Sequence, residues 1–190
     1  MSQGLPGEHC SERILIACIG NIFFGDDGFG VEVAQRLLSR QGQPYGEQVQ
    51  VVDFGIRGLD LAYTLLDDGY DTLVLVDAIP PRGGAPGTLY LIEPDLTKLG
   101  PEQGVEAGRV AIDSHSMDPF KVLAFARTLG AQPIRTLLVG CEPSNVRAGQ
   151  ADEEMHMGLS QPVQVAVDEA VKMIDSLVER LLKRKESSDV

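Results

Sequence analysis

Short, continuous apolar runs recur along the chain, and each is bounded by Gly, Asp or Glu. Three of them predict buried strands, at residues 14–19, 72–76 and 136–139. A strand covered by helices on both faces is apolar at nearly every position, whereas a strand with one solvated face alternates. A fourth strand is expected at 49–52. A fifth, at 88–92, follows a Pro- and Gly-rich loop and is expected to be an edge or antiparallel strand.

Apolar residues at helical spacing fill the intervals between these runs, and they predict helices near 31–38, 59–65, 119–126 and 160–181. Asp118 followed by Pro119 is typical of a helix start, and Ser160 is expected to cap the last helix. Strands that alternate with helices imply right-handed crossovers and a mainly parallel sheet. The predicted fold class is α/β, a three-layer sandwich in which a mostly parallel, twisted sheet of about five strands is flanked by helices.

The length of 190 residues suits one domain of ordinary size. We expect a flexible N-terminal tail over 1–12, a single domain over 13–185 and a flexible C-terminal tail over 186–190. The N-terminal stretch has neither the basic nor the apolar region of a secretory signal. No apolar run approaches the roughly 18 residues that a membrane helix needs.

Charge and cysteine usage narrow the possible partners. The chain has 28 acidic and 16 basic residues, a formal net charge of −12, which disfavours binding to nucleic-acid phosphates. Cys10, Cys18 and Cys141 are far apart, so neither disulfides nor zinc–thiolate sites are expected. Cys18 is predicted to be inert core, and Cys141, at a strand end, to be more accessible. A cytoplasmic protein without nucleic-acid or membrane partners is the interpretation that fits best.

Two adjacent carboxylates, Asp26 and Asp27, follow the first predicted strand and precede a helix. One acid can satisfy free N–H groups at the helix start, but a second is not needed for that purpose. Asp77 ends another buried strand, and the carboxyl ends of parallel strands share one edge of the sheet. These acids are therefore candidates for binding a cation or transferring protons there.

His115 stands in a loop just before the predicted helix at 119–126. Two carboxylates and an imidazole would form a hard-to-borderline metal site with open positions. The loop at 53–58 is a further strand end, in which Gly55, Arg57 and Gly58 could present backbone and side-chain groups to an extended peptide. Motifs of nucleophile elbows, dinucleotide sites, P-loops and His-Glu-x-x-His metalloproteases are missing.

Five segments together resemble the [NiFe]-hydrogenase maturation endopeptidases, and the resemblance extends over nearly the whole chain. They are 19–30 (IGNIFFGDDGFG), 53–58 (DFGIRG), 76–78 (VDA), 86–88 (PGT) and 114–115 (SH). The resemblance implies a twisted sheet between helices. It also implies a peptidase, usually classed as aspartic, that removes a C-terminal extension from the precursor of the hydrogenase large subunit after nickel insertion.

By motif position, the resemblance implies that Asp27, Asp77 and His115 bind the metal and carry catalysis. Asp26 is the fallback for the first carboxylate. The nickel would be carried by the substrate rather than permanently bound, the partner would be the large-subunit precursor, and the protein would act as a monomer. The family often has Thr where this chain has Ile56, so the polar contact of that hydroxyl is lost and the hydrogenase partner could differ.

Three other functions stay open at this stage. The chain could be a nickel-binding assembly factor that docks on the precursor without cutting it. It could be a small-molecule- or nucleotide-binding α/β domain, or an unrelated hydrolase that uses an acid pair. The residues alone predict an α/β domain with an acidic, possible metal-binding cleft; the peptidase function depends on the resemblance.

Overall fold

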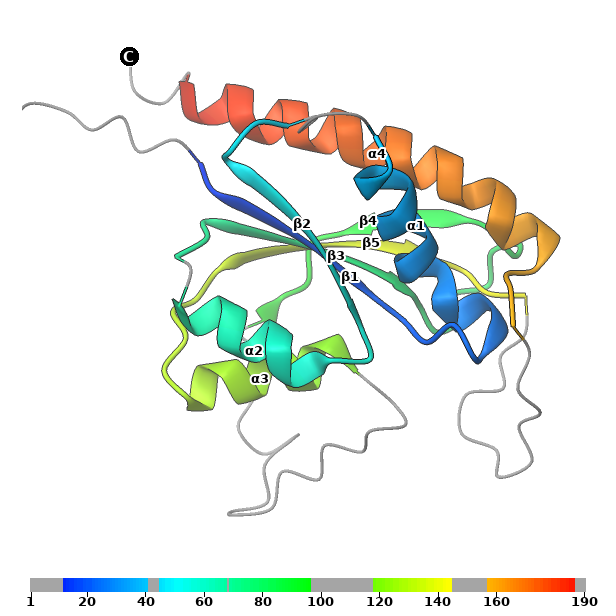
Figure 1. The fold of residues 1–190 in the computed structure, drawn as a ribbon, viewed down its shortest axis with the longest axis horizontal. Coiled ribbons are helices and arrows are strands. Elements are labelled where there is room, and N and C mark those ends of the chain that lie inside the picture. Colours follow the sequence, from blue (N-terminus) through cyan, green and yellow to red (C-terminus); the bar gives the residue numbers. More distant parts are fainter. Residues whose placement is uncertain (1–11, 41–44, 68, 97–117, 145–156, 187–190) are drawn as a thin grey trace, which may run out of the picture.

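A central sheet divides the molecule into layers (Figure 1). The computed structural model describes residues 12–40, 45–67, 69–96, 118–144 and 157–186. Their sheet has the strand order β2-β1-β3-β5-β4, in which β4 is antiparallel to β5 and the other neighbours are parallel. The strands are β1 (Ile14–Ile19), β2 (Val49–Gly55), β3 (Thr72–Ala78), β4 (Leu89–Ile92) and β5 (Arg135–Cys141). The predicted strands, including the antiparallel edge, are confirmed.

Two helices cover each face of the sheet (Figure 1). The helices α1 (Phe29–Leu38) and α4 (Gln161–Glu186) pack on one face, and α2 (Gly58–Asp67) and α3 (Pro119–Thr128) pack on the other. The three-layer α/β sandwich predicted from the sequence is therefore confirmed. None of the helices in the described part of the chain is long and apolar enough to cross a membrane.

The strand β1 shows why its sequence is apolar throughout. Ile14, Ile16 and Cys18 belong to the core beneath α1 and α4, whereas the side chains between them belong to the core beneath α2 and α3. All six residues of the strand are buried. Alternate side chains of a strand point to opposite faces, so two covered faces require an unbroken apolar run.

Gly30 allows α1 to lie directly on the strand ends. A Cβ atom at this position would lie 2.0 Å from the carbonyl oxygen of Ile19 and 2.4 Å from that of Val76. Both distances are far below van der Waals contact, so a larger residue would push the helix off the sheet. The close approach brings the turn before α1 next to the end of β3.

The predicted helix starts are at the right positions. The Asp118 carboxylate accepts a hydrogen bond from the backbone N–H of Phe120 at 2.9 Å, as expected of an N-cap before Pro119. α4 begins directly after Ser160, whose carbonyl accepts from the N–H of Gln164 at 2.8 Å. The predicted tails lie outside the described residues except at their inner ends, so the domain boundaries stay a prediction.

Burial of Cys141 corrects one expectation. Cys18 is core, as predicted, but Cys141 is equally buried. Burial raises the pKa of Cys18 far above its ordinary value and that of Cys141 to about 12. Cys141 ends its strand but not the core, because β4 pairs alongside it and the start of α4, including Val163, belongs to the same apolar cluster.

Candidate active site

Asp27 and Asp77 meet at the carboxyl edge of the sheet. Asp27 lies in a short 3-10 turn, η1 (Gly25–Gly28), between β1 and α1, and this turn packs against β3. Asp77 is the penultimate residue of β3. The charge of Asp27 is close enough to act on the ionisation of Asp77. The expectation that two strand ends bring these carboxylates together therefore agrees with the structure.

Asp77 is a buried carboxylate, with 8% of its surface exposed. Burial raises its pKa well above the ordinary value, and the negative charges of Asp27 and Asp118 raise it further. A hydrogen bond from the N–H of Ala78 opposes these effects in part. A group in this setting favours either a proton or a nearby cation, since each removes the cost of an isolated buried charge.

Asp27 is exposed and its turn is held by the preceding loop. The N–H of Asn21 lies 3.0 Å from the Asp27 carboxylate and 3.1 Å from its carbonyl oxygen. Gly20 adopts φ +149°, and a Cβ there would lie 2.1 Å from the same carbonyl. The glycine is required because the Asp27 backbone packs against it, so the Gly-Asn pair sets the position of the acid.

Asp26 has a different role from its neighbour. It is 6% exposed, and its carboxylate accepts from the N–H of Ser144 at 2.7 Å and from the N–H of Ser160 at 2.6 Å. The Ser160 hydroxyl also donates to it, at 2.9 Å. One of the two acids was expected to satisfy N–H groups at the start of its own helix. Asp26 instead bonds the residue before α4, and for Asp27 the expectation stays a prediction.

His115, the predicted third member of the site, lies outside the described residues, and its role stays a prediction. Asp118 follows it by three residues in the sequence, and Asp118 is near enough to Asp77 to raise the pKa of that carboxyl. Within the described ranges, no group of three or more His, Cys, Asp or Glu side chains is arranged to hold a metal ion. Of the three predicted metal ligands, only Asp27 and Asp77 lie within the described residues.

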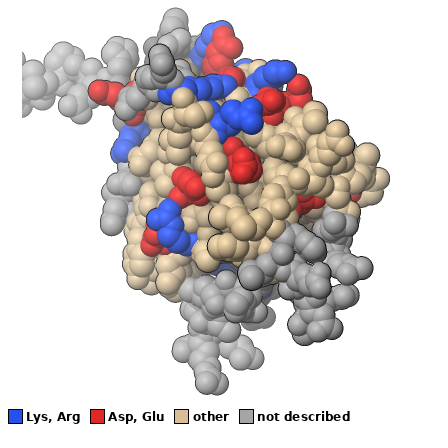
Figure 2. All heavy atoms as spheres, turned by 45° about the vertical axis from the view of Figure 1, so that its right-hand side comes forward, with Lys and Arg blue, Asp and Glu red and all other residues tan. Residues whose placement is uncertain are grey.

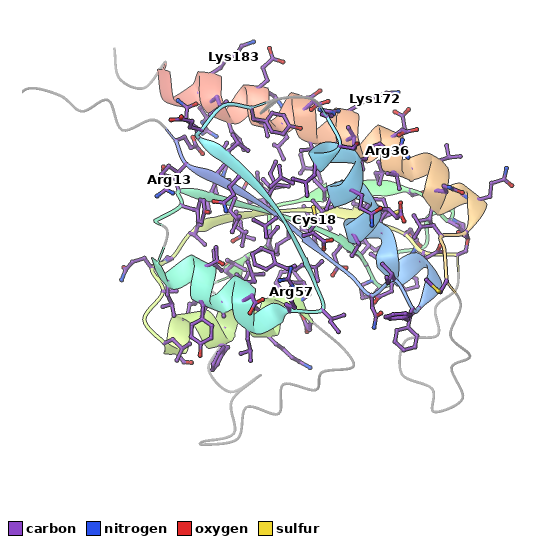
Figure 3. All side chains as sticks on the ribbon, in the orientation of Figure 1. Arg13, Cys18, Arg36, Arg57, Lys172 and Lys183 are labelled. Atoms are coloured by element: carbon purple, nitrogen blue, oxygen red, sulfur yellow. The ribbon has the colours of Figure 1, made fainter. Side chains whose placement is uncertain are left out.

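The loop after β2 lies beside the first loop, because the N–H of Gly20 donates to the carbonyl of Gly55 at 3.1 Å. The Arg57 guanidinium folds back on its own loop and donates to the carbonyls of Asp53 and Phe54 and, at 3.3 Å, to the Asp60 carboxylate. Figure 3 shows Arg57 next to the start of α2. Its first role is therefore to shape the loop; a contact of Gly55, Arg57 or Gly58 with substrate stays a prediction.

A third buried carboxylate, Glu142, holds the loop after β3. Its side chain accepts from the N–H groups of Arg82 and Gly83, each at 3.0 Å, and from the Tyr90 hydroxyl at 2.7 Å. The hydrogen bond from Tyr90 is the largest of the effects that lower the pKa of Glu142. Sequence analysis did not find this residue, because its partners lie in a loop and a strand far away in the chain.

Two neighbouring loops at this edge of the sheet carry exposed apolar side chains. Ile22 and Phe23 lie in the first loop and are 38% and 47% exposed, and Ile56, in the adjoining loop, is 54% exposed. Figure 2 turns the right-hand side of Figure 1 forward and shows a broad area without charged residues, although the chain is strongly acidic. Exposed apolar side chains in these two loops are suited to contact a polypeptide.

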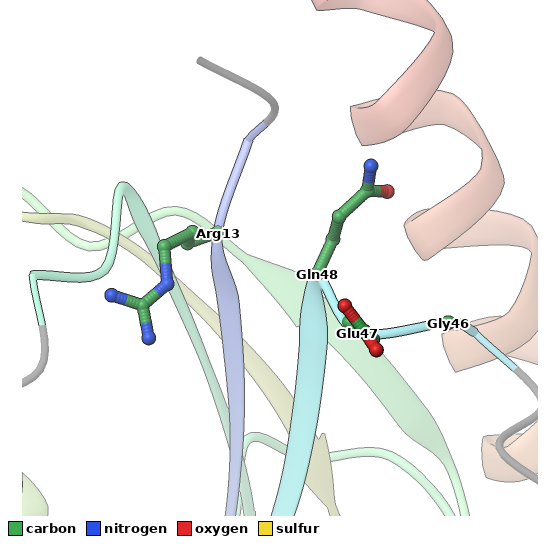
Figure 4. A pocket seen from close by; sticks show the side chains of 4 residues that line it. All are labelled: Arg13, Gly46, Glu47 and Gln48. Atoms are coloured by element: carbon green, nitrogen blue, oxygen red, sulfur yellow. The ribbon is translucent and has the colours of Figure 1, made fainter. Parts of the chain in front are cut away.

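A shallow hollow of about 480 Å³ lies elsewhere, at the amino ends of β1 and β2 (Figure 4). Arg13, Gly46, Glu47 and Gln48 line it. Ligands of open parallel sheets bind at the carboxyl ends of the strands, so this hollow is on the opposite edge from the candidate site. It adds nothing to the chemistry of the acids.

The chain is similar to proteins of one family over most of its length. The family model for hydrogenase maturation proteases matches residues 31–177. The hydrogenase expression/formation protein HoxM of Azotobacter vinelandii is 32% identical over 169 residues, which cover 88% of this chain and 73% of HoxM. The hydrogenase 2 maturation protease of Escherichia coli is 28% identical over 162 residues, covering 85% of this chain and 88% of the relative.

A solved structure shows the same fold. The hydrogenase maturating endopeptidase HybD from E. coli superposes with a TM-score of 0.63 at 24% identity, and the match covers 88% of this chain and 93% of HybD. The family match spans most of the chain and agrees with the resemblance in its sequence motifs. The chain therefore belongs to the hydrogenase maturation protease family and is a peptidase.

Proposed function

We propose that the protein is an endopeptidase that removes the C-terminal extension of a [NiFe]-hydrogenase large-subunit precursor after nickel has been inserted. The observation that carries the proposal is the pairing of an exposed Asp27 with a buried Asp77 at one sheet edge, in a chain of this protease family. The acids lie next to exposed apolar loops that a peptide substrate could contact.

Nickel is part of the substrate in this proposal. The donor set suits it, because two carboxylates and an imidazole are hard-to-borderline ligands that leave positions open for the precursor's own ligands. Asp27, Asp77 and His115 would dock the nickel centre, and His115 precedes Asp118 by three residues in the sequence. A divalent cation between the acids would also remove the repulsion that raises the pKa of Asp77.

Peptide hydrolysis needs a positioned water and a group that takes its proton. Bound nickel would supply positive charge that polarises the water or the scissile carbonyl. The carboxylates of the chain hold the nickel centre and can accept the proton from the attacking water, which is then transferred to the leaving amine. Both described cysteines are buried with raised pKa values, which argues against a thiolate nucleophile among the described residues.

Cleavage would depend on nickel in the precursor, since a nickel-free precursor lacks the group that the acids bind. The peptidase would then act as a checkpoint for nickel insertion. The proposal includes an aspartic-type peptidase that works in the cytoplasm as a monomer, without nucleic-acid or membrane partners. Two buried free thiols are consistent with a reducing compartment.

The direct test uses purified protein with nickel-loaded and nickel-free large-subunit precursor. Mass spectrometry is expected to show loss of the C-terminal extension from the loaded precursor only. Equal cleavage of both precursors would contradict nickel recognition. Stable binding of the loaded precursor without any change of its mass would favour the non-cleaving assembly factor instead.

A further inference from the structure

The Asp26 carboxylate joins three parts of the chain that are distant in sequence. It lies in η1, and both of its oxygens are used by the backbone N–H groups of Ser144, after β5, and Ser160, before α4. The Ser160 hydroxyl donates to Asp26 and lies 2.9 Å from the Ser144 hydroxyl. Three hydrogen bonds therefore converge on one buried carboxylate and fix its position.

The geometry of the 3-10 turn links Asp26 to Asp27. Such a turn has three residues per revolution, so successive side chains point roughly 120° apart. When Asp26 is fixed inward on the two serines, Asp27 is turned to another side of the turn. There Asp27 is exposed, and its charge reaches Asp77. The contacts of Asn21 hold the turn from its other end.

We propose that Asp26 is a positioning residue, which sets the rotation of η1 so that Asp27 faces Asp77. This inference rests on the proposed function. It assigns to Asp26 a role on which the role of Asp27 depends. Metal ligands need orientation by groups behind them, and losing such a group costs typically about 10–100-fold in metal affinity or activity. Asp26 touches neither Asp77 nor substrate in this role; it acts through the backbone of Asp27.

The competing explanation is that Asp26 only stabilises the fold by bonding the start of α4. Asp26→Asn disturbs these contacts, because its amide replaces one acceptor oxygen by a donor that faces N–H groups. The two explanations then differ in whether Ni²⁺ binding and cleavage change, or stability alone. Ser160→Ala is a milder variant, since it removes the hydroxyl contact and keeps the backbone N–H bond. Asp175→Asn is the matched control. Asp175 lies in the middle of α4, away from the sheet edge, and its carboxylate accepts hydrogen bonds from Arg40 and Tyr45.

Four quantities are measured for each protein: the melting temperature, the affinity for Ni²⁺ by calorimetric titration with nickel chloride, and kcat and KM for the nickel-loaded precursor. At a temperature where Asp26→Asn is folded, we expect it to bind Ni²⁺ more weakly and to have a lower kcat, each by about 10–100-fold. Ser160→Ala is expected to change both in the same direction by a smaller factor. The control is expected to lower the melting temperature and leave the affinity and kcat as in the wild type.

The outcomes separate this inference from the proposed function. If the wild type neither binds Ni²⁺ nor cleaves the precursor, the proposed function is wrong, and the positioning role with it. If the wild type does both, and folded Asp26→Asn keeps its affinity and kcat while losing stability, Asp26 is structural and the inference is wrong. If Asp26→Asn does not fold, Ser160→Ala decides: unchanged affinity and kcat would overturn the positioning role.

Discussion

The negative charge of Asp27 acts on the buried carboxyl of Asp77, and after burial it is the largest influence that raises the pKa of that group. Two like charges held together at the end of a sheet destabilise the folded protein when both are ionised. Arrangements of this kind are enriched at functional sites, where a cation or a proton completes them. The effect of this pair on the stability of the fold can be measured, and so can its effect on the rate of cleavage.

Replacing Asp77 with Asn is expected to stabilise the fold at neutral pH. The raised pKa means that the folded chain binds a proton at Asp77 more tightly than the unfolded chain does. The wild type therefore loses stability as the pH rises above the ordinary Asp pKa of about 3.9, until the folded-state pKa is passed. Thermal melts in the presence of a chelator should show a higher melting temperature for Asp77→Asn at pH 7.5, and a gap that closes near pH 3.5.

Asp175→Asn is the control for this experiment, and we expect it to change the melting temperature at pH 7.5 in the opposite direction. Hydrogen bonds from Arg40, then from Tyr45, lower the pKa of Asp175 despite its partial burial. Its contribution to stability is present above the unfolded pKa and is lost as the pH falls, so this variant should melt below the wild type at pH 7.5. A lower melting temperature for both variants would show that Asp77 stabilises the fold and would contradict the acid-pair account.

Gly30→Ala is expected to destabilise the protein through the contact between α1 and the strand ends. The added methyl would collide with two backbone carbonyls that cannot move aside, and such overpacking costs typically about 1–3 kcal/mol. For a chain of this size that is a fall in melting temperature of roughly 2–10 °C. Gln35→Ala, on the exposed face of the same helix, should change it little. An unchanged Gly30→Ala melt would mean that α1 lies farther from the sheet.

The fold was predictable from the sequence because burial on two faces leaves a local signal. Residues 14–19 predict β1 with its observed bounds, and the parallel order then places Asp27 and Asp77 at one edge. The bonds from Asp26 to Ser144 and Ser160 were not predictable, since they depend on side-chain directions in a turn and on the packing of α4. The burial of Cys141 was missed for a similar reason: its cover comes from distant elements.

The exposed aromatic ring of Phe23 is expected to contribute to substrate binding. Phe23→Ser should raise KM for the nickel-loaded precursor several-fold, because an apolar contact next to the acids is lost, and it should leave the melting temperature nearly unchanged. Leu129→Ser is the matched control: Leu129 is similarly exposed, at 45%, but it follows the C-terminal end of α3. Equal effects of the two variants on KM would argue against a substrate contact at Phe23.

Thiol chemistry provides an independent check on the catalytic class. In a Cys10→Ser variant, Cys18 and Cys141 remain, and both are buried with raised pKa values. Neither should react with iodoacetamide in the folded protein, because the thiolate is the reactive form and is disfavoured there. Mass spectrometry should show both labelled in denaturant. Rapid labelling of the folded protein with parallel loss of cleavage would contradict a carboxylate mechanism.

The central claim is that Asp27 and Asp77 act together on the precursor, and the rate of cleavage by variants of these two residues tests it most directly. Wild type, Asp27→Asn and Asp77→Asn, each shown to be folded by its melt, are incubated with nickel-loaded precursor, and removal of the extension is followed by mass spectrometry. We expect each variant to cleave at least about 100-fold more slowly, as for the loss of a catalytic acid or base. Cleavage by both variants at the wild-type rate would contradict the account.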